Sequence, residues 1–429
     1  MKNRIAIIDG IRTPMAKAGT ELKSVSADDL GAFAVKELLA RSEIDTSLID
    51  ELIFGNVSMP ADAANIARVI ALKSGLPQTM PSYTVQRNCA SGAESITTAA
   101  DKINAGEASI IIAGGTESMS HYPLLYNKQM TGLFERLFKS KSLWAKFCQL
   151  LSFRPGHLKP VISVLQGLRD PICGMMMGST ADLLAREFHI TREEQDEFAL
   201  LSHERATEAI NGSFFADEII PVPILPDYNE IFKTDSGPRK NQNMEALEKL
   251  KPYFDKREGT VTVGNSCPLT DGAAALLLMS EEKAKELGYT PLGFLRDYAY
   301  AGLEPERMGL GPVYATNKLL NKSGIEFDDF GLIELNEAFA AQVIANEKAF
   351  ASKSFAKEFL NRDKEIGEID REALNINGGA IALGHPVGMT GTRMILTLLK
   401  SMKRKDVPLG LATMCIGGGQ GAALALETA

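Results

Sequence analysis

Three short segments of this chain place a reactive side chain among glycines. They are Asn88-Cys89-Ala90-Ser91-Gly92, the stretch from Asn377-Gly378-Gly379 to Gly384-His385-Pro386, and Cys415-Ile416-Gly417-Gly418-Gly419-Gln420-Gly421. A cysteine attacks as its thiolate, and an imidazole is able to take the thiol proton. Glycines let the backbone approach a substrate closely. Together the three segments predict an active site with two cysteines and one histidine.

The first of these cysteines lies where a strand is expected to turn into a helix. Residues 82–86 are typical of a strand, and residues 90–103 have small and apolar side chains at helical spacing. The start of a helix favours an anion, so we expect it to lower the pKa of Cys89. The alternative is a buried cysteine that acts only as a small hydrophobic side chain.

Two glycine-rich loops also have spacings found in nucleotide-binding proteins. The loop from Gly379 to Gly384 lacks the Lys and Ser or Thr that should follow in a phosphate-binding loop. The loop from Gly417 to Gly421 lies eight residues from the last residue given, with no helix and second strand after it. Neither loop is therefore predicted to bind a nucleotide.

The composition predicts a globular protein of two or three domains. The chain has 429 residues, of which 45% are hydrophobic, and no apolar stretch approaches membrane-spanning length. Residues 1–4 lead directly into a predicted strand at residues 5–8 without a signal-peptide pattern, which predicts a cytoplasmic protein. Five widely spaced cysteines without a Cys-x-x-Cys pair argue against disulfides and metal sites. A net charge of −8 argues against nucleic-acid binding.

The two ends of the chain contain a repeated pattern. Residues 30–56 match residues 310–336 at Leu-Gly, Leu-Leu, Ile-acidic, Leu-Ile and Asn positions, with one residue of slippage. Predicted strands such as 110–113 and 332–335 alternate with helices such as 32–40, which indicates α/β layers with largely parallel strands. A duplication of this kind predicts a pseudo-dyad and a site between the two halves.

A long insertion of different character lies between the halves, at about residues 120–270. Apolar side chains recur at helical spacing in residues 133–138 and 143–151, and residues 121–169 hold eight Lys or Arg but only one acid, Glu135. This pattern predicts helices docked on the surface of the protein, with contact to a partner or a membrane as the alternative. Thr191 and Glu194 form a capping-box pattern at the start of a later helix.

With these residues laid out, the chain resembles the thiolase family over essentially its whole length. The matching segments are residues 88–92, 114–120, 265–272 and 336–339, the Gly-His-Pro segment and the terminal Cys-x-Gly-Gly-Gly-x-Gly. The resemblance implies a five-layered αβαβα core from two halves. One half comprises residues 1–120 and 271–293, the other residues 294–429, and residues 121–270 form an inserted loop domain. The resemblance also implies a homodimer or homotetramer.

The resemblance also implies an activity and the residues that carry it. Thiolases cleave a 3-ketoacyl-CoA with CoA, through an acylated cysteine, into acetyl-CoA and a shortened acyl-CoA. Cys89, deprotonated by His385, would be the nucleophile, and Cys415 would be the acid and base at the enolate. Gly417 and Asn336 would help to hold the two developing negative charges. Coenzyme A would be a substrate, and no permanently bound cofactor or metal is expected.

Contacts to the CoA tail are also expected from the resemblance. Arg239 falls near the nucleotide, Met177 and Phe339 line the pantetheine channel, and Cys267 stands where many members have a pantetheine-contacting Ser. Met176 stands where short-chain biosynthetic members often have His, which argues against a preference for acetoacetyl-CoA. The basic, apolar insertion resembles that of thiolases in fatty-acid oxidation complexes. Residues 121–169 could therefore contact a hydratase/dehydrogenase partner subunit or a membrane.

Three alternatives remain beside this interpretation. A biosynthetic acetoacetyl-CoA thiolase would share the whole catalytic set. A decarboxylating condensing enzyme of similar fold typically has His in place of Asn336 and lacks the second cysteine, so Asn336 and Cys415 argue against it. A non-catalytic lipid-binding relative would have little reason to keep Cys89, His385 and Cys415 together.

Overall fold

A ten-stranded sheet forms the centre of the molecule in the computed structural model, which describes residues 4–429. Its strand order is β12 (Leu332–Leu335), β13 (Leu409–Ile416), β14 (Gln420–Thr428), β11 (Gly293–Gly302), β1 (Ile5–Arg12), β10 (Thr270–Ser280), β5 (Ile110–Ser118), β3 (Glu51–Gly55) and β4 (Ser82–Val85), and β2 (Ala16–Lys17) pairs with β10. Residues 1–3 lie outside the described part, and the predicted strand at residues 5–8 is the start of β1.

The sheet repeats one pattern of pairing on each side of its middle. β3 pairs in parallel with β5, and β12 pairs in parallel with β13. Antiparallel pairs then lead inward on each side to β1 and β11, which also pair antiparallel with each other at residues 5–7 and 293–295. The expectation of largely parallel strands is therefore wrong, because parallel pairing is confined to the outer strands of the sheet. The predicted repeat is confirmed: residues 30–56 run from α1 (Ala27–Ser42) into β3, and residues 310–336 run from α11 (Gly311–Ser323) into β12.

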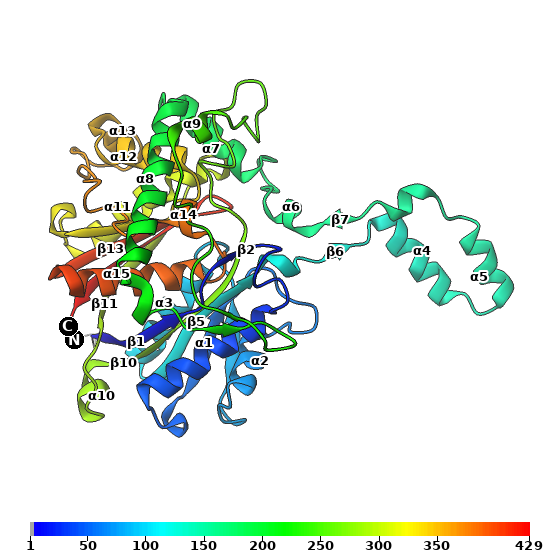
Figure 1. Cartoon of the computed structure of the whole chain (residues 1–429), viewed down its shortest axis with the longest axis horizontal. Helices are drawn as coiled ribbons and strands as arrows, with labels where there is room; N and C mark the ends of the chain where they lie inside the picture. Colours follow the sequence, from blue (N-terminus) through cyan, green and yellow to red (C-terminus); the bar gives the residue numbers. More distant parts are fainter. Residues whose placement is uncertain (1–3) are drawn as a thin grey trace.

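Helices form three layers around the two halves of the sheet (Figure 1). α1 and α2 (Ile66–Lys73) share one apolar core with the first half, and α11 and α12 (Ala340–Phe350) share another with the second half. A third core lies between the halves, around α3 (Ser91–Ala105) and α15 (Thr390–Lys405). The predicted αβαβα arrangement of five layers is therefore confirmed.

The two central helices approach each other closely at their first turns. A Cβ on Gly391 of α15 would lie 2.4 Å from the backbone nitrogen of Ala93 in α3, so only glycine fits there. A Cβ on Gly92 would lie 2.9 Å from the carbonyl oxygen of Gly388. Because the helices are in backbone contact, the segments that precede them, which carry Cys89 and His385, are held at one place in the middle layer.

The insertion supplies α7 (Met177–Glu187), α8 (Arg192–Asn211), α9 (Met244–Glu248) and the short pair β8 (Val222–Pro223) and β9 (Ile231–Phe232). Shorter helices elsewhere are α10 (Glu281–Glu286), α13 (Lys353–Phe359) and α14 (Ala380–Leu383). The predicted capping box is confirmed. The backbone nitrogen of Glu194 donates to Thr191 Oγ1 at 3.1 Å, and the Thr191 nitrogen donates to the Glu194 carboxylate at 2.6 Å.

Residues 121–169, named here the arm, extend away from the rest of the molecule (Figure 1). β6 (Leu124–Leu125) and β7 (Val161–Ile162) pair as its stem, followed outward by α4 (Lys128–Lys139) and α5 (Leu143–Leu150), with α6 (Ser163–Gly167) at the return. Both predicted helices are present. The expectation that they dock on the protein's own surface is wrong, because the stem carries the α4–α5 hairpin outward and leaves Phe138 91% exposed.

None of the helices within residues 4–429 combines the length and the apolar character needed to cross a bilayer.

Candidate active site

Cys89 lies on the turn that joins β4 to α3, as the sequence predicts. Asn88, the residue before it, has a φ of 44°, and its carbonyl accepts a hydrogen bond from the backbone nitrogen of Ser91 at 3.0 Å. The side-chain amide of Asn88 donates to the carbonyl oxygen of Gly417 at 2.8 Å. This bond ties the turn of Cys89 directly to the glycine loop from the other half.

The surroundings of Cys89 raise its pKa above that of an ordinary thiol. Burial is the largest cause, and hydrogen bonds from the backbone N–H groups of Gly417 and of Cys89 itself oppose it. The lowered pKa expected from the helix start is therefore wrong, because desolvation of the thiolate outweighs the backbone donors. Cys89 rests as a thiol, and a base must take its proton when it attacks.

His385 is buried and held by one hydroxyl group. Its Nδ1 lies 2.6 Å from Thr390 Oγ1, and that hydroxyl donates its own proton to the Pro386 carbonyl at 2.9 Å. Thr390 can therefore only accept from the ring, so Nδ1 carries the imidazole proton. Within residues 4–429, His385 Nε2 has no hydrogen-bond partner, which leaves its lone pair available as a base.

The charge state of His385 agrees with this tautomer. Burial, followed by the positive charge of Arg393, lowers its pKa to about 4. Arg393 lies on α15 and pairs with Glu334 at 2.9 Å. The imidazole is consequently neutral at physiological pH and holds a single proton, on Nδ1.

The second predicted cysteine, Cys415, is buried near the end of β13. Burial, followed by the negative charges of ionised Cys89 and Cys267, raises its pKa well above that of an ordinary thiol. Cys415 therefore holds its proton firmly and is suited to donate it to a carbanion. The chain then turns through Gly418 and Gly419, whose φ angles of 90° and 76° favour glycine.

Asn336 follows β12 directly, and its side chain is buried. Its backbone nitrogen donates to the Thr413 carbonyl at 3.0 Å, which fixes it to the neighbouring strand. Both polar atoms of its side-chain amide lack a partner among residues 4–429. A buried amide without partners is costly, so it is suited to hold a water or a substrate oxygen.

Glu117 is a buried residue that the sequence reasoning did not single out. Its carboxylate accepts hydrogen bonds from the backbone nitrogens of Val57, Ser58 and Gly388, at 3.1, 3.0 and 2.9 Å. It thereby joins a loop of the first half to the turn that follows His385. Its place in the Gly-Gly-Thr-Glu-Ser segment of residues 114–118 was the available signal.

Three of the four residues expected to contact CoA lie near the catalytic residues. A Cβ on Gly417 would lie 3.3 Å from Met177 Sδ. Burial, followed by the negative charge of ionised Cys89, raises the pKa of Cys267 to about 12. The neighbouring Ser266 forms an antiparallel backbone β-bridge with Phe339. Arg239 is exposed, and its backbone nitrogen donates to His203 Nδ1 at 3.2 Å. Among residues 4–429 it has no hydrogen bond to a catalytic residue.

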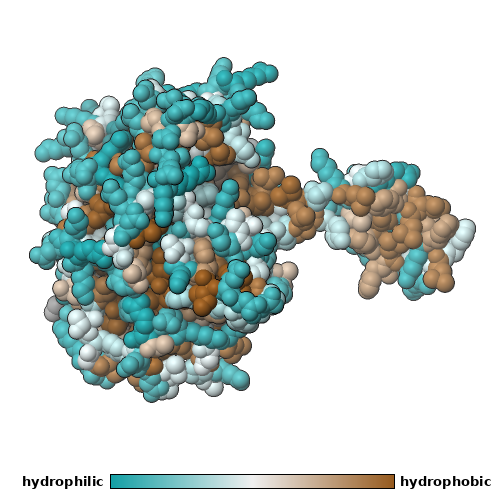
Figure 2. Space-filling model, in the orientation of Figure 1, coloured by the Kyte–Doolittle hydropathy of each residue, from teal (hydrophilic) through white to brown (hydrophobic). Residues whose placement is uncertain are grey.

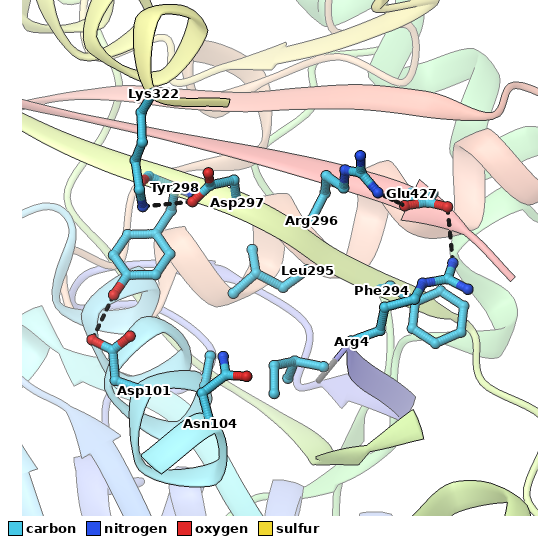
Figure 3. Close-up of a pocket in the computed structure, with 12 residues that line it drawn as sticks. Arg4, Asp101, Asn104, Phe294, Leu295, Arg296, Asp297, Tyr298, Lys322 and Glu427 are labelled. Atoms are coloured by element: carbon cyan, nitrogen blue, oxygen red, sulfur yellow. Dashed lines mark hydrogen bonds and ion pairs between the residues drawn. The ribbon is translucent and has the colours of Figure 1, made fainter. Parts of the chain in front are cut away.

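The hollow drawn in Figure 3 lies elsewhere, at the junction of β1 and β11, and none of the predicted site residues lines it. Its carboxylates are engaged by neighbours: Glu427 pairs with Arg4 at 2.8 Å, Asp297 with Lys322, and Asp101 accepts from the Tyr298 hydroxyl. These contacts link the two halves of the protein at this hollow. We therefore assign no ligand to the hollow.

Comparison with protein families decides the identity of this fold and site. Residues 5–282 match the N-terminal domain of thiolases, and residues 289–428 match the thiolase C-terminal domain. The chain belongs to the thiolase family. It is accordingly an acyltransferase.

Curated relatives of this thiolase match it over nearly their whole length. A 3-ketoacyl-CoA thiolase of Shewanella piezotolerans is 43% identical over 425 residues, which cover 99% of this chain and 97% of the relative. A protein of the same name from Aliivibrio fischeri is 43% identical over 426 residues, covering 99% and 96%.

Solved structures show the same fold. The acetyl-CoA acetyltransferase of Bacillus anthracis superposes with a TM-score of 0.88 at 38% identity, covering 100% of this chain and 99% of the other. Human mitochondrial 3-ketoacyl-CoA thiolase in complex with CoA gives a TM-score of 0.85 at 33% identity, covering 100% and 98%.

Proposed function

We propose that this thiolase cleaves 3-ketoacyl-CoA with CoA to acetyl-CoA and a shortened acyl-CoA, as a step of fatty-acid β-oxidation. The observation that carries the proposal is the meeting of the two halves at one thiol. The Asn88 amide, next to Cys89, donates to the Gly417 carbonyl at 2.8 Å, and the Gly417 N–H favours the ionised form of Cys89. His385 presents a neutral Nε2 without a partner among residues 4–429. An acylated cysteine needs this combination of a base and an oxyanion donor.

In the first step, the Cys89 thiol gives its proton to His385 Nε2 while its sulfur attacks the keto carbon, C3. The C2–C3 bond then breaks, and its electron pair passes to the thioester enolate. Cys415 donates its proton to C2, which releases acetyl-CoA and leaves the acyl group on Cys89. The raised pKa of Cys415 suits it to protonate a strongly basic enolate.

In the second step, the thiol of CoA attacks the acyl carbon on Cys89. Its proton passes to the Cys415 thiolate, and the departing Cys89 sulfur takes back the proton held by His385. All three residues thus return to their starting states. In the reverse direction, the same groups carry out a Claisen condensation.

Two sets of donors would stabilise the negative oxygens that form in these steps. The backbone N–H groups of Cys89 and Gly417 serve the oxygen on the acylated carbon, since both favour negative charge at Cys89 by lowering its pKa. His385 and a water held by Asn336 serve the enolate oxygen. The unpartnered amide atoms of Asn336 support this role.

Coenzyme A enters this proposal as a substrate, and no permanently bound cofactor is needed. Met177, Cys267 and Phe339 would line the pantetheine channel, and Arg239 would lie near the nucleotide. The catalytic residues come from both halves: residues 1–120 with 271–293 supply Cys89, and residues 294–429 supply Asn336, His385 and Cys415. The loop domain, residues 121–270, would supply three of these CoA contacts, Met177, Arg239 and Cys267.

The degradative role is supported by the names of the curated relatives, which are 3-ketoacyl-CoA thiolases. The acetyl-CoA acetyltransferase among the solved structures represents the biosynthetic alternative, at a lower identity of 38%. The proposal includes a cytoplasmic homodimer or homotetramer. It also includes contact of the arm with a hydratase/dehydrogenase partner or a membrane.

Rates of CoA-dependent cleavage across 3-ketoacyl-CoA substrates of four to sixteen carbons test the proposal. We expect kcat/KM to be higher for medium and long chains than for acetoacetyl-CoA. A maximum at acetoacetyl-CoA would instead support the biosynthetic alternative. Absence of cleavage at every length would refute the activity.

Replacing Thr390 by Val should lower kcat by roughly 10–100-fold with little change in KM, the size of effect seen when a partner that orients a catalytic imidazole is lost. Val keeps the shape of the side chain but cannot accept from His385 Nδ1–H, so the ring is no longer held in one tautomer. Thr390→Ser restores the acceptor and should recover most of the rate. An equally slow Thr390→Ser variant, or a change confined to KM, would show that the hydroxyl does not act through His385.

A further inference from the structure

We propose that Glu117 and Glu337 are positioning residues that hold the segment of His385, residues 379–388, at its two ends. We name the pair the carboxylate clamp. The proposal rests on the proposed function, because it names what holds the base of that reaction in place. Carboxylates normally lie on the outside, where Figure 2 shows hydrophilic residues over much of the body, but Glu117 and Glu337 are 0% and 1% exposed. Two buried carboxylates at one short segment therefore require a reason.

Glu337 holds the first end of the segment. Its carboxylate accepts hydrogen bonds from the backbone nitrogen of Ile381 at 3.1 Å, from the Asn375 amide at 2.8 Å and from the Ser202 hydroxyl at 2.6 Å. Ser202 Oγ accepts in turn from the backbone nitrogen of Gly379 at 3.2 Å. A Cβ on Gly379 would lie 2.2 Å from the carboxyl carbon of Glu337, so glycine is needed for this approach. Because Ser202 lies on α8, the loop domain shares in holding the segment.

Glu117 holds the other end of the segment, from the first half of the protein. The backbone nitrogen of Gly388 donates to its carboxylate at 2.9 Å, and a Cβ on Gly388 would lie 2.9 Å from the same oxygen. The backbone nitrogens of Val57 and Ser58 and the Ser58 hydroxyl also donate to Glu117. Burial raises the pKa of both clamp carboxyls, and these N–H and O–H donors oppose the rise because they favour the ionised form.

The short length of the segment makes both contacts matter for His385. The imidazole lies four residues after Ile381 and three residues before Gly388. A base must lie within about 3 Å of the proton that it takes, so a shift of the backbone at either end would move Nε2 away from its target. Glu117 also lies close enough to Cys89 for its negative charge to raise the pKa of that thiol. The clamp therefore fixes the base relative to the half that supplies the nucleophile.

Alkylation of Cys89 by iodoacetamide tests the clamp in the full-length protein without any CoA substrate. Mass spectrometry of the digested protein gives the rate at Cys89. Glu117→Gln and Glu337→Gln should each slow this rate by roughly 10–100-fold near neutral pH, the loss expected when a catalytic group is misplaced by about 1 Å. Glutamine keeps the size of the side chain, but it has one acceptor oxygen and turns an NH₂ group toward the N–H donors. Steady-state kcat should fall by a similar factor with little change in KM.

The pH dependence of the alkylation separates positioning from general damage to the site. At high pH the thiolate of Cys89 forms without help from His385, so the Gln variants should then approach the wild-type rate. A variant whose site is merely distorted or closed would remain slow at every pH.

Two milder variants and a matched control complete the set. Ser202→Ala and Ser58→Ala each remove one hydroxyl donor but keep the carboxylate, and they should slow alkylation by about 2–10-fold, the effect of a single hydrogen bond. Asp182 is a buried carboxylate that accepts from the backbone nitrogens of Thr260 and Val261 at 2.9 and 3.0 Å. Within residues 4–429 it has no hydrogen bond to residues 379–388. Asp182→Asn therefore makes the same kind of change elsewhere, and it should leave the alkylation of Cys89 unchanged.

His385→Ala sets the reference, because it removes the base itself. If His385→Ala slows alkylation and neither Gln variant does, the clamp is wrong and the proposed function stands. Alkylation at the wild-type rate in His385→Ala would refute the base of the proposed function, and the clamp with it. An equal loss in Asp182→Asn would overturn the clamp, since any buried carboxylate would then have the same effect. Where the Gln variants do not fold, wild-type rates in both Ser→Ala variants would likewise overturn it.

Discussion

Replacing Cys89 by Ala or Ser should abolish the acyl-enzyme. Mass spectrometry of the intact wild-type protein after addition of a 3-ketoacyl-CoA without CoA should show one acyl group, and neither variant should show it. Turnover should fall by at least about 10³-fold, because the nucleophile and its base act as a unit. Asn88 and Gly417 remain as they are, so substrate should still bind.

The matched control is Cys267→Ser, which changes a second thiol near Cys89 without touching the proposed chemistry. It should still become acylated. An undiminished adduct in Cys89→Ala would move the nucleophile elsewhere, and loss of the adduct in Cys267→Ser alone would point to Cys267 as its position.

Replacing Cys415 by Ala should separate acylation from proton transfer. Exchange of the C2 protons of acetyl-CoA with deuterium oxide should slow by roughly 10²–10⁴-fold, the usual contribution of a general acid or base. Cys89 should still accept an acyl group from a short acyl-CoA, because that step requires no proton at C2. NMR measures the exchange, and mass spectrometry measures the acylation.

Exchange at the wild-type rate in Cys415→Ala would contradict the assignment of the base. Loss of acylation together with exchange would mean that the substitution disturbs Cys89 itself, since Cys89 lies close enough to Cys415 to raise its pKa. Cys415→Ser puts a hydroxyl of similar size in place of the thiol, and so separates loss of the acidic thiol from loss of side-chain volume.

Much of the fold followed from local patterns in the sequence. The strand at residues 332–335 and the capping box at Thr191 were predicted because hydrophobic period and cap chemistry are properties of neighbouring residues. The repeat of residues 30–56 at residues 310–336 predicted the symmetric halves. The direction in which the arm projects was not predictable, because helical periodicity marks an apolar face without saying what covers it.

The electrostatics of the site depended on contacts that the sequence does not show. The position of Cys89 at a helix start predicted a lowered pKa, but burial raises it, and the core against which Cys89 packs includes side chains hundreds of residues away, such as Met394 and Met414. Thr390 and Glu117 were missed for the same reason, since their roles depend on hydrogen bonds formed only in the folded chain. Thr390 lies only five residues after His385 in the sequence, so its contact was easier to predict than that of Glu117, which is 271 residues from Gly388.

The position of β10 in the sheet also sets an order of events during synthesis. β10 (Thr270–Ser280) lies between β1 and β5, so the first half lacks an inner strand until residue 280 has left the ribosome. By then the whole loop domain, including the arm, has emerged from the ribosome. The apolar side chains of β1 and β5 remain unpaired until β10 follows. A nascent chain of this enzyme thus passes through a long interval in which it is prone to aggregate, and a chaperone that shields β1 and β5 during that interval would raise the yield of folded protein.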